Sequence, residues 1–278
     1  MGREFTPEAW GKIYDDYSVA MRRCERCGFV FFDPSLAGNE VFYRQLEHTE
    51  YFCQARPEFT RTLEFTCGKG IRRTLDVGCG SGAFLDLAKK AGCQTFGLEL
   101  NSAAAEKARA KGHTIYGRLL NELDRDQTSG GFDLITLFQV LEHLPDPVAT
   151  LKDAAALLNP GGYISVAVPS EEGMCRLAPW DPYNWPPHHL SRWRRADFEQ
   201  LAGAAHLELV QSGGDVLLGS GIEQLWQLHN RLACVLGKRG RWGGETLPRL
   251  VSLVYRKTGM KFLFPRRGRS IYAYFCRE

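Results

Sequence analysis

Short apolar runs recur through the middle of the chain and predict strands. They occupy residues 71–77, 94–100, 113–117, 132–138 and 163–169. The fourth run, FDLITLF, is almost continuously apolar, as expected of a strand that is buried on both faces. Because segments with helical spacing alternate with these runs, the pattern predicts a parallel, doubly wound α/β sheet.

Amphipathic segments between the runs predict helices. Asn101 is a suitable N-cap for the second helix, and Gly92 and Gly112 are suitable terminators. Two further strands are expected at 207–214 and 270–277. The expected helices lie in residues 81–92, 101–112, 147–162 and 195–206, and the third of them ends in a turn.

The regular pattern does not extend over the whole chain. We expect an N-terminal extension at 1–70, which includes a helix at 40–52, ahead of the main domain at 71–278. Residues 179–193 contain four prolines and three tryptophans, which predicts an ordered loop over the sheet edge rather than a helix. A basic helical insertion is expected at 219–268, between the last two strands.

The composition indicates a globular protein without a membrane span. The chain has 278 residues, of which 44% are hydrophobic, enough for one large α/β domain with additions. No apolar run approaches the roughly 18–20 residues that cross a bilayer, and the N-terminus lacks a signal pattern. The nine cysteines lack a disulfide-like spacing, so we expect reduced thiols and a cytoplasmic location. The net charge is +3, but residues 231–269 alone carry eleven Lys or Arg and one acid.

The stretch LDVGCGSGAFLDLA places Gly78, Gly80 and Gly82 between a predicted strand and a predicted helix. The phosphate-binding sequence GxxxxGK[ST] does not occur. Gly78, Gly80 and Ala83 do satisfy the dinucleotide-binding pattern, and Glu99 stands about where a ribose-binding acid would. An NAD-dependent oxidoreductase is therefore one alternative.

Asp76, which precedes the glycine turn, favours a different ligand. A carboxylate is poorly placed beside a pyrophosphate, which is also negative, but it suits a ligand with an ammonium and a sulfonium group. S-adenosylmethionine carries both groups and no phosphate. We expect the amides of the glycine turn to bind its amino-acid end, and Glu99 to accept hydrogen bonds from both ribose hydroxyls.

Four segments have the order and separation of one enzyme family: LDVGCGSG, FGLEL, FDLITLFQVLEHLPDP and LLNPGGYISVAVP. Over about residues 71–215 the chain resembles the class I S-adenosylmethionine-dependent methyltransferases, and among them the small-molecule O-methyltransferases of quinone biosynthesis. The resemblance implies a Rossmann-like, seven-stranded sheet of order 3-2-1-4-5-7-6 with an antiparallel last strand. It also implies a cofactor site formed by Asp76, Gly78, Cys79, Gly80, Gly82, Glu99, Leu100, Gly117, Arg118, Leu119, Phe138 and Gln139.

Three histidines are candidates for handling the acceptor. Methyl transfer requires a positioned acceptor and removal of its proton. His143 follows the fourth predicted strand, and His188 and His189 follow two prolines in the proline-rich loop. The resemblance implies that His189 closes on the substrate pocket. We expect at least one of the three to be catalytic, the alternative being ordinary polar residues at a helix start and in an exposed loop.

Two segments resemble metal-binding sequences, and neither is expected to hold an ion. The resemblance brings in the first, because some relatives bind a divalent metal through an ExxEH sequence and a later histidine. The matching residues are Gln139, Glu142, His143 and His189, and an amide is a weaker ligand for a hard cation than a carboxylate.

The sequence CERCG, which contains Cys24 and Cys27, resembles the second half of a zinc knuckle that precedes some related methyltransferases. No cysteine precedes Cys24, and a structural zinc ion needs four ligands. Cys53 and Cys67 could complete such a site only at an unusual spacing. We therefore expect a turn without metal.

The basic helices expected at 222–258 allow three interpretations. They could cap the active site with a solvated basic face, contact an anionic membrane or a lipid-linked substrate, or bind a nucleic acid. Against methylation of nucleic bases, the fourth strand continues as FQVLEH rather than the [DN]PP[YFW] of amino-methylating relatives.

Together these features predict a cytosolic S-adenosylmethionine-dependent methyltransferase that acts on a hydroxyl of a small molecule, such as a phenol, quinol, sugar or natural-product scaffold. The alternatives are a methyltransferase that acts on a lipid-linked or nucleic-acid substrate through the insertion, an NAD-dependent oxidoreductase, and a non-catalytic binding protein. The sequence leaves the acceptor and the oligomeric state open.

Overall fold

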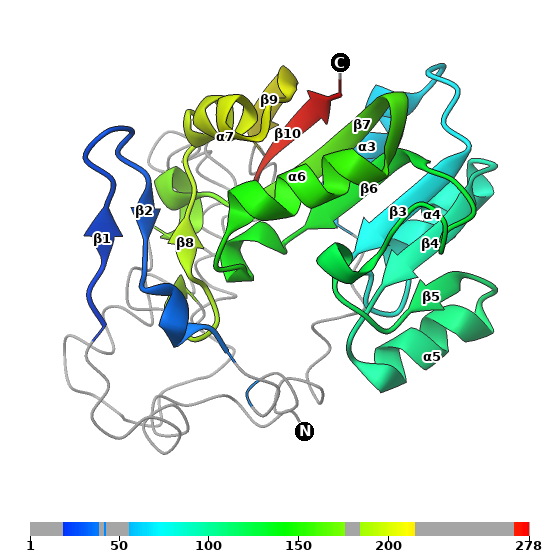
Figure 1. The fold of residues 1–278 in the computed structure, drawn as a ribbon, viewed down its shortest axis with the longest axis horizontal. Helices are drawn as coiled ribbons and strands as arrows, with labels where there is room; N and C mark the ends of the chain where they lie inside the picture. Colours follow the sequence, from blue (N-terminus) through cyan, green and yellow to red (C-terminus); the bar gives the residue numbers. More distant parts are fainter. Residues whose placement is uncertain (1–18, 39–41, 43–55, 176–183, 215–269, 278) are drawn as a thin grey trace, which may run out of the picture.

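Strands and helices occur at or near their predicted positions in the computed structural model, which describes residues 19–38, 42, 56–175, 184–214 and 270–277 (Figure 1). The strands of the large sheet are β3 (Arg73–Val77), β4 (Gln94–Leu98), β5 (Thr114–Tyr116), β6 (Phe132–Phe138), β7 (Leu158–Pro169), β9 (Glu208–Gly214) and β10 (Ser270–Cys276). The α-helices are α3 (Pro57–Thr66), α4 (Ala83–Lys90), α5 (Ser102–Ala110), α6 (Pro147–Leu157) and α7 (Asp197–Ala205). Short helical turns are η1 (Pro34–Leu36), η3 (Leu120–Glu122), η4 (Leu141–His143) and η5 (Glu171–Cys175).

The seven strands hydrogen-bond in the order β5-β4-β3-β6-β7-β10-β9. All pairs from β5 through β7 are parallel, whereas β10 is antiparallel to both β7 and β9. In chain order this is the predicted arrangement 3-2-1-4-5-7-6, so the predicted fold class is confirmed. The parallel strands end at one common edge, which is where open α/β sheets bind ligands.

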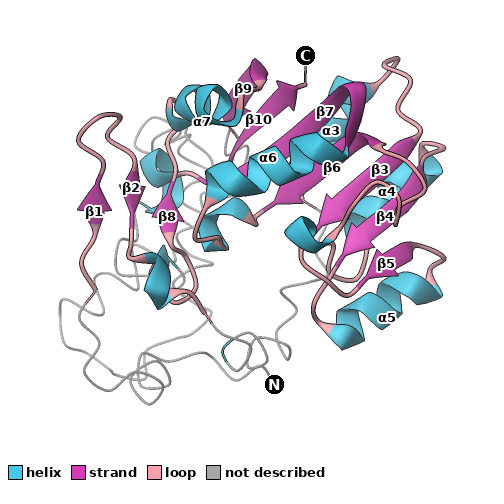
Figure 2. Ribbon diagram, in the orientation of Figure 1, coloured by secondary structure: helices cyan, strands magenta, loops and turns pink. Residues whose placement is uncertain are grey.

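Helices cover both faces of the sheet (Figure 2). On one face α6 and α7 contact each other, and their apolar residues join Leu75 and Ile135 in a buried cluster. On the other face α4 and α5 bury Phe84 and Ala108 against Leu134. Because β6 contributes side chains to both clusters, its sequence has to be apolar at nearly every position.

The boundary between α6 and β7 differs from the prediction. A helix ending in a turn was expected over 147–162, with the strand beginning at 163, whereas the helix ends at Leu157 and β7 already begins at Leu158. The pairing with β6 jumps from Phe132 and Leu158 to Leu134 and Tyr163, so residues 159–162 bulge out of the ladder. Pro160 within this bulge cannot continue a helix, which explains the early end.

Helix α3 lies in the segment predicted as an extension, yet it packs on the large sheet. The Phe59 ring is 5.0 Å from the Phe138 ring and 5.5 Å from the Phe84 ring. The hydroxyls of Thr62 and Ser165 are 2.8 Å apart and hydrogen-bonded. The α3 part of the extension therefore belongs to the helical layer of the sheet.

A second, three-stranded sheet joins the N-terminal hairpin to the proline-rich loop (Figure 1). Its strands are β1 (Arg22–Arg23), β2 (Val30–Phe31) and β8 (Ser191–Arg192), and all pairs are antiparallel. Strand β8 begins two residues after His189, so the hairpin is attached to the segment that carries two candidate histidines.

Several predictions lie outside the described residues. They are the basic insertion at 219–268, all of the helix at 40–52 except Phe42, and residues 179–183 of the proline-rich loop. Within the described ranges, no helix has both the length and the apolar character needed to cross a bilayer.

Candidate functional site

The glycine turn joins β3 to α4, and its three glycines all have a left-handed backbone. The φ angles are +70° at Gly78, +53° at Gly80 and +81° at Gly82. Glycine adopts this region without the steric cost that other residues incur. At Gly78 a Cβ atom would also lie only 3.0 Å from Cγ2 of Val140, so a side chain there would be crowded.

The amides of the turn donate within the chain. The N–H groups of Gly78 and Cys79 both donate to the Leu98 carbonyl, at 2.8 and 3.0 Å. The Gly80 N–H donates to Oε2 of Glu99 at 2.8 Å. The structure therefore does not support the expected role of these three amides as donors to a ligand. They hold the turn against the end of β4 instead.

Asp76 is buried at the end of β3, beside the turn. The Thr136 hydroxyl donates to Oδ1 of Asp76 at 2.6 Å. Burial raises the pKa of Asp76 to about 7, the charge of Glu99 acts in the same direction, and the Thr136 hydrogen bond opposes both. The Asp76 carboxyl is thus poised to gain or lose its proton near neutral pH.

Glu99 directly follows β4 and is held by two backbone amides. Its Oε2 accepts from Gly80 and its Oε1 accepts from Asn101, both at 2.8 Å. Burial raises the pKa of Glu99, and the backbone hydrogen bonds oppose that shift. Because β3 and β4 are neighbours in parallel register, Asp76 and Glu99 stand at adjacent strand ends, as predicted.

Two large apolar side chains are exposed beyond the ends of β4 and β5. Leu100 is 65% exposed and Leu119 is 49% exposed. Among the described residues, only the Glu99 carbonyl comes within 4.0 Å of a Cβ built on Gly117, so that part of the chain leaves the space beside Gly117 nearly open. Arg118 donates through Nη1 to Oε1 of Gln127 at 2.9 Å. Exposed leucines next to an open glycine can contact the face of a planar ligand.

The end of β6 packs against α3. Phe138 is a core residue, since its ring packs at 4.9 Å from the Phe84 ring. Gln139 has a φ of +58°, and its side-chain amide donates to Oε1 of Glu58 at 3.3 Å and to the Ser270 hydroxyl at 3.2 Å. Gln139 thereby links β6, α3 and β10.

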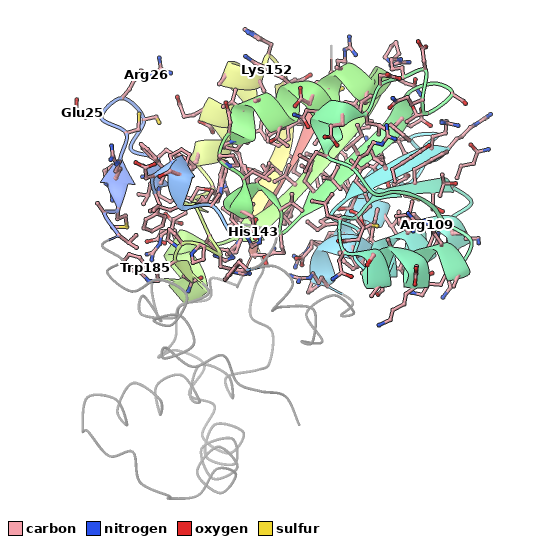
Figure 3. The ribbon with its side chains drawn as sticks, turned by 60° about the horizontal axis from the view of Figure 1, so that its bottom comes forward. Glu25, Arg26, Arg109, His143, Lys152 and Trp185 are labelled. Atoms are coloured by element: carbon pink, nitrogen blue, oxygen red, sulfur yellow. The ribbon has the colours of Figure 1, made fainter. Side chains whose placement is uncertain are left out.

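The three candidate histidines meet in one buried cluster, although 45 residues separate His143 from His188. The His143 ring lies 4.6 Å from the His188 ring and 4.8 Å from the His189 ring. The rings of His188 and His189 stack at 4.5 Å. Figure 3 shows His143 and Trp185 toward the same end of the molecule, away from the hairpin tip at Glu25 and Arg26.

Glu142 is fully buried beside this cluster. Neither of its carboxylate oxygens accepts a hydrogen bond from the part of the chain that the structure describes. Nε2 of His143 lies 3.7 Å from its Oε1. Burial raises the pKa of Glu142 to about 8. It lowers the pKa of His143 to about 3 and that of His189 well below its usual range, so both rings are neutral.

Glu58 was not predicted to belong to the site. It is buried in the first turn of α3 and accepts the Gln139 hydrogen bond. A signal was present, because Pro57 followed by an acid is a typical helix start. Arg192 was not predicted either. Its guanidinium stacks over the Trp185 ring at 4.7 Å and the Phe32 ring at 5.7 Å.

The cysteine pair forms a turn between β1 and β2. The N–H of Cys24 donates to the Phe29 carbonyl, and the N–H of Gly28 donates to the Cys24 carbonyl, both at 2.8 Å. Cys67 is exposed at the end of α3, and Cys53 lies outside the described residues. Over the described ranges, neither Cys24 nor Cys27 belongs to a group of three metal-ligating residues.

The His113 side chain packs against the glycine turn. Its Nε2 donates to Oδ1 of Asp86 at 3.0 Å, and its Nδ1 is hydrogen-bonded to the Thr95 hydroxyl at 2.8 Å. A Cβ built on Gly82 would lie 3.0 Å from Cδ2 of His113, so the ring touches the last glycine of the turn.

We expect His113→Ala to loosen the glycine turn, because it leaves the buried Thr95 hydroxyl without its partner and opens space beneath Gly82. The loss should lower the free energy of unfolding by about 1–3 kcal/mol. It should also weaken binding of S-adenosylmethionine, the ligand expected at this turn from the sequence. Calorimetric titration and thermal unfolding check this, with the exposed His206→Asn as control. Unchanged cofactor affinity in His113→Ala would contradict the role.

Comparison with known proteins agrees with this geometry. The chain is 31% identical over 153 residues to the ubiquinone biosynthesis O-methyltransferase of Methylococcus capsulatus, covering 48% of this chain and 65% of that protein. It is 29% identical over 145 residues to the protein of the same name from Alkalilimnicola ehrlichii, covering 45% and 59%. The chain thus matches less than two thirds of the length of either relative.

The fold is similar to that of solved structures. A SAM-dependent methyltransferase from Archaeoglobus fulgidus superposes with a TM-score of 0.53 at 18% identity, covering 86% of this chain and 100% of that one. At this identity the likeness concerns the fold alone. Residues 39–212 match the methyltransferase domain family. The matched segment is more than half of the sequence, and the chain therefore belongs to the methyltransferase domain family.

Proposed function

We propose that this chain transfers a methyl group from S-adenosylmethionine to a hydroxyl group of a small molecule. The observation that carries the proposal is the pair of buried carboxylates, Asp76 and Glu99, at adjacent strand ends around a left-handed glycine turn. Membership of the methyltransferase domain family supports it. Two nearby carboxylates favour a cationic ligand over a diphosphate, which argues against the oxidoreductase alternative.

The cofactor is proposed to lie along the carboxyl ends of β3, β4 and β6. Glu99 would accept hydrogen bonds from the ribose hydroxyls, and Asp76 would lie near the cationic amino-acid end. Leu100 and Leu119 would contact the adenine ring, since both are exposed at the adjoining strand ends. The remaining residues proposed to line the site are Gly78, Cys79, Gly80, Gly82, Gly117, Arg118, Phe138 and Gln139.

In the proposed reaction the acceptor oxygen attacks the methyl carbon in line with the carbon–sulfur bond. That bond breaks, its electron pair goes to sulfur, and the sulfonium becomes a neutral thioether. The acceptor loses its proton, and placing the two reactants is most of what the enzyme must do. His143, His188 and His189 are proposed to orient the acceptor hydroxyl, and one of their neutral imidazoles to take up its proton, because their cluster adjoins the end of β6.

The names of the relatives favour a phenol or quinol as acceptor. Both curated relatives are called ubiquinone biosynthesis O-methyltransferases. The aromatic side chains near the histidine cluster are compatible with a ring-shaped acceptor, since Phe42 lies 6.1 Å from His188. We propose a cytoplasmic location, with the segment at 219–268 as a cap or as a contact with an anionic membrane or lipid-linked substrate.

Calorimetric titration with S-adenosylmethionine and its demethylated product tests the cofactor, with NAD as the competing ligand. Binding of both sulfur nucleosides and not of NAD supports the proposal, and binding of NAD alone refutes it. Incubation with a panel of phenols, quinols and sugars, followed by mass spectrometry, tests the reaction. A product that gains one methyl on oxygen supports it. Binding without transfer to any acceptor would favour a non-catalytic protein.

We expect cofactor binding to release a proton below neutral pH. The Asp76 pKa is about 7 without a ligand, and a cation placed beside it favours the carboxylate. Affinity for S-adenosylmethionine should therefore rise with pH up to about 7 and then level off. Titration in two buffers of different ionisation enthalpy counts the released protons, and Asp76→Asn should abolish this release.

The raised pKa of Asp76 also determines how the stability of the folded protein depends on pH. The folded state holds the Asp76 proton up to pH about 7, whereas the unfolded chain loses it near 3.8. The contribution of Asp76 to stability is therefore greatest at low pH and is lost as the pH rises to about 7. Asp76→Asn should flatten this dependence in pH-dependent denaturation of the ligand-free protein.

A further inference from the structure

Four potential ligand groups converge where β6 meets the proline-rich loop. One nitrogen from each of His143, His188 and His189 lies within 4.8 Å of the others. Within the described ranges this is the one group of three metal-ligating side chains. Nitrogen atoms around a tetrahedral zinc ion stand roughly 3.3 Å apart, given Zn–N bonds of about 2.0 Å. The nitrogens would therefore have to approach one another by at most about 1.5 Å to share one ion.

A hydrogen bond determines which ring nitrogen of His143 is available to bind a metal ion. Its Nδ1 lies 2.6 Å from the His188 carbonyl oxygen, which can only accept, so Nδ1 carries the proton. In a neutral ring Nε2 then carries the lone pair. Metal-binding histidines usually donate their other N–H to a carbonyl or carboxylate in this way, which holds the ring in the ligating orientation.

Glu142 supplies an independent indication. It is 0% exposed, and its oxygens accept no hydrogen bond from any described residue. A buried carboxylate without partners is costly, and the cost falls when a cation sits beside it. The nearest cluster group is the His143 ring, at 3.7 Å from Oε1.

We propose that His143, His188 and His189 bind a divalent transition-metal ion of the zinc type, with the Glu142 carboxylate beside it. The set differs from the one that the ExxEH resemblance implies. Gln139 does not belong to it, because its amide is engaged by Glu58 and Ser270, and His188 joins it instead. Three imidazoles favour zinc, cobalt or nickel over magnesium, which prefers oxygen ligands.

A bound ion would supply a Lewis acid at the position proposed for the acceptor hydroxyl, and the histidines that hold it would then act on that hydroxyl through the ion instead of accepting its proton themselves. That role depends on the proposed function, whereas metal binding itself can be tested without it. The Leu190 N–H donates to the Glu142 carbonyl at 2.6 Å and so joins the proline-rich loop to η4. This hydrogen bond holds the loop histidines next to His143, where they would share the ion.

The test is titration of chelator-treated full-length protein with Co²⁺, followed by visible absorption, and with Zn²⁺, followed by calorimetry. The protein carries Cys24→Ser and Cys27→Ser, so that the hairpin thiols cannot contribute. We expect one Co²⁺ per chain, with the intense visible bands of a low-coordinate site and no thiolate charge-transfer band. Mg²⁺ should not compete.

Matched histidine variants locate the site. His188→Ala and His189→Ala should each weaken Zn²⁺ binding at least about tenfold, a loss of the size that removing a metal-site residue causes. His206→Asn, which changes an exposed histidine at the end of α7, should bind Zn²⁺ as the parent does. Equal affinity in His188→Ala and the parent would overturn the proposal. If the alanine variants do not fold, the parent spectrum decides, and absence of the visible bands overturns it.

Cofactor binding by the same samples separates the two proposals. If the demethylated cofactor binds and methyl transfer proceeds while the protein takes up neither Co²⁺ nor Zn²⁺, the metal inference fails and the proposed function stands. If Zn²⁺ binds as expected but no sulfur nucleoside does, the metal inference stands and the proposed function fails.

Discussion

Glu99→Gln is expected to weaken binding of the demethylated cofactor at least about tenfold, a loss consistent with one buried donor left unsatisfied. Each carboxylate oxygen accepts one backbone amide, from Gly80 and from Asn101. A glutamine has a single acceptor oxygen, so its NH₂ group would face one of these N–H donors. The substitution also removes one acceptor for the ribose hydroxyls. Calorimetric titration measures the loss.

Glu106→Gln is the matched control, because Glu106 is exposed on α5 and the change removes the same charge. We expect it to bind the cofactor as the unmodified protein does. Glu99→Ala should bind still more weakly than Glu99→Gln. If both Glu99 variants bind with unchanged affinity while the fold is intact, the proposed cofactor position is wrong.

Gly97→Val is expected to disrupt both stability and cofactor binding. A Cβ built on Gly97 would lie 2.5 Å from Sγ of Cys79 and 2.8 Å from Cδ1 of Ile115. The first contact pushes on the glycine turn and the second on β5. Overpacking of this kind typically costs about 1–3 kcal/mol. Chemical denaturation measures the stability, and titration of the surviving folded protein measures the affinity.

Gly203→Ala is the control, and we expect it to raise stability where Gly97→Val lowers it. Gly203 lies on an exposed turn of α7, and a Cβ there meets nothing within 4 Å. Alanine favours a helix over glycine by up to about 1 kcal/mol, so this variant should be slightly more stable. Wild-type stability in Gly97→Val would mean that the contact between β4 and the turn is looser than the structure indicates.

Local signals in the sequence predicted most of the sheet. The apolar run at 132–138 coincides with β6, because a strand buried on both faces leaves a continuous signal. The N-cap at Asn101 is confirmed by a hydrogen bond from the Ala104 N–H to its side chain at 2.8 Å. The carboxylates at 76 and 99 could be placed together because parallel strands end at one edge.

The histidine cluster could not be assembled from the sequence in the same way. His143 follows β6, whereas His188 and His189 reach it through a loop whose path depends on tertiary contacts. Residues in such loops have no periodicity that reveals their neighbours. The partnership of Glu58 with Gln139 spans 81 residues and connects α3 to the sheet. A long-range contact of this kind has no local signature.

The position of β10 bears on how the chain can be assembled during synthesis. It is the last strand in sequence, yet it lies between β7 and β9. Until Ser270–Cys276 leaves the ribosome, β9 lacks the one strand that it pairs with among the described residues, and β7 lacks its antiparallel neighbour. The nascent protein must therefore carry an unfinished, association-prone border while the residues between 214 and 270 are being added.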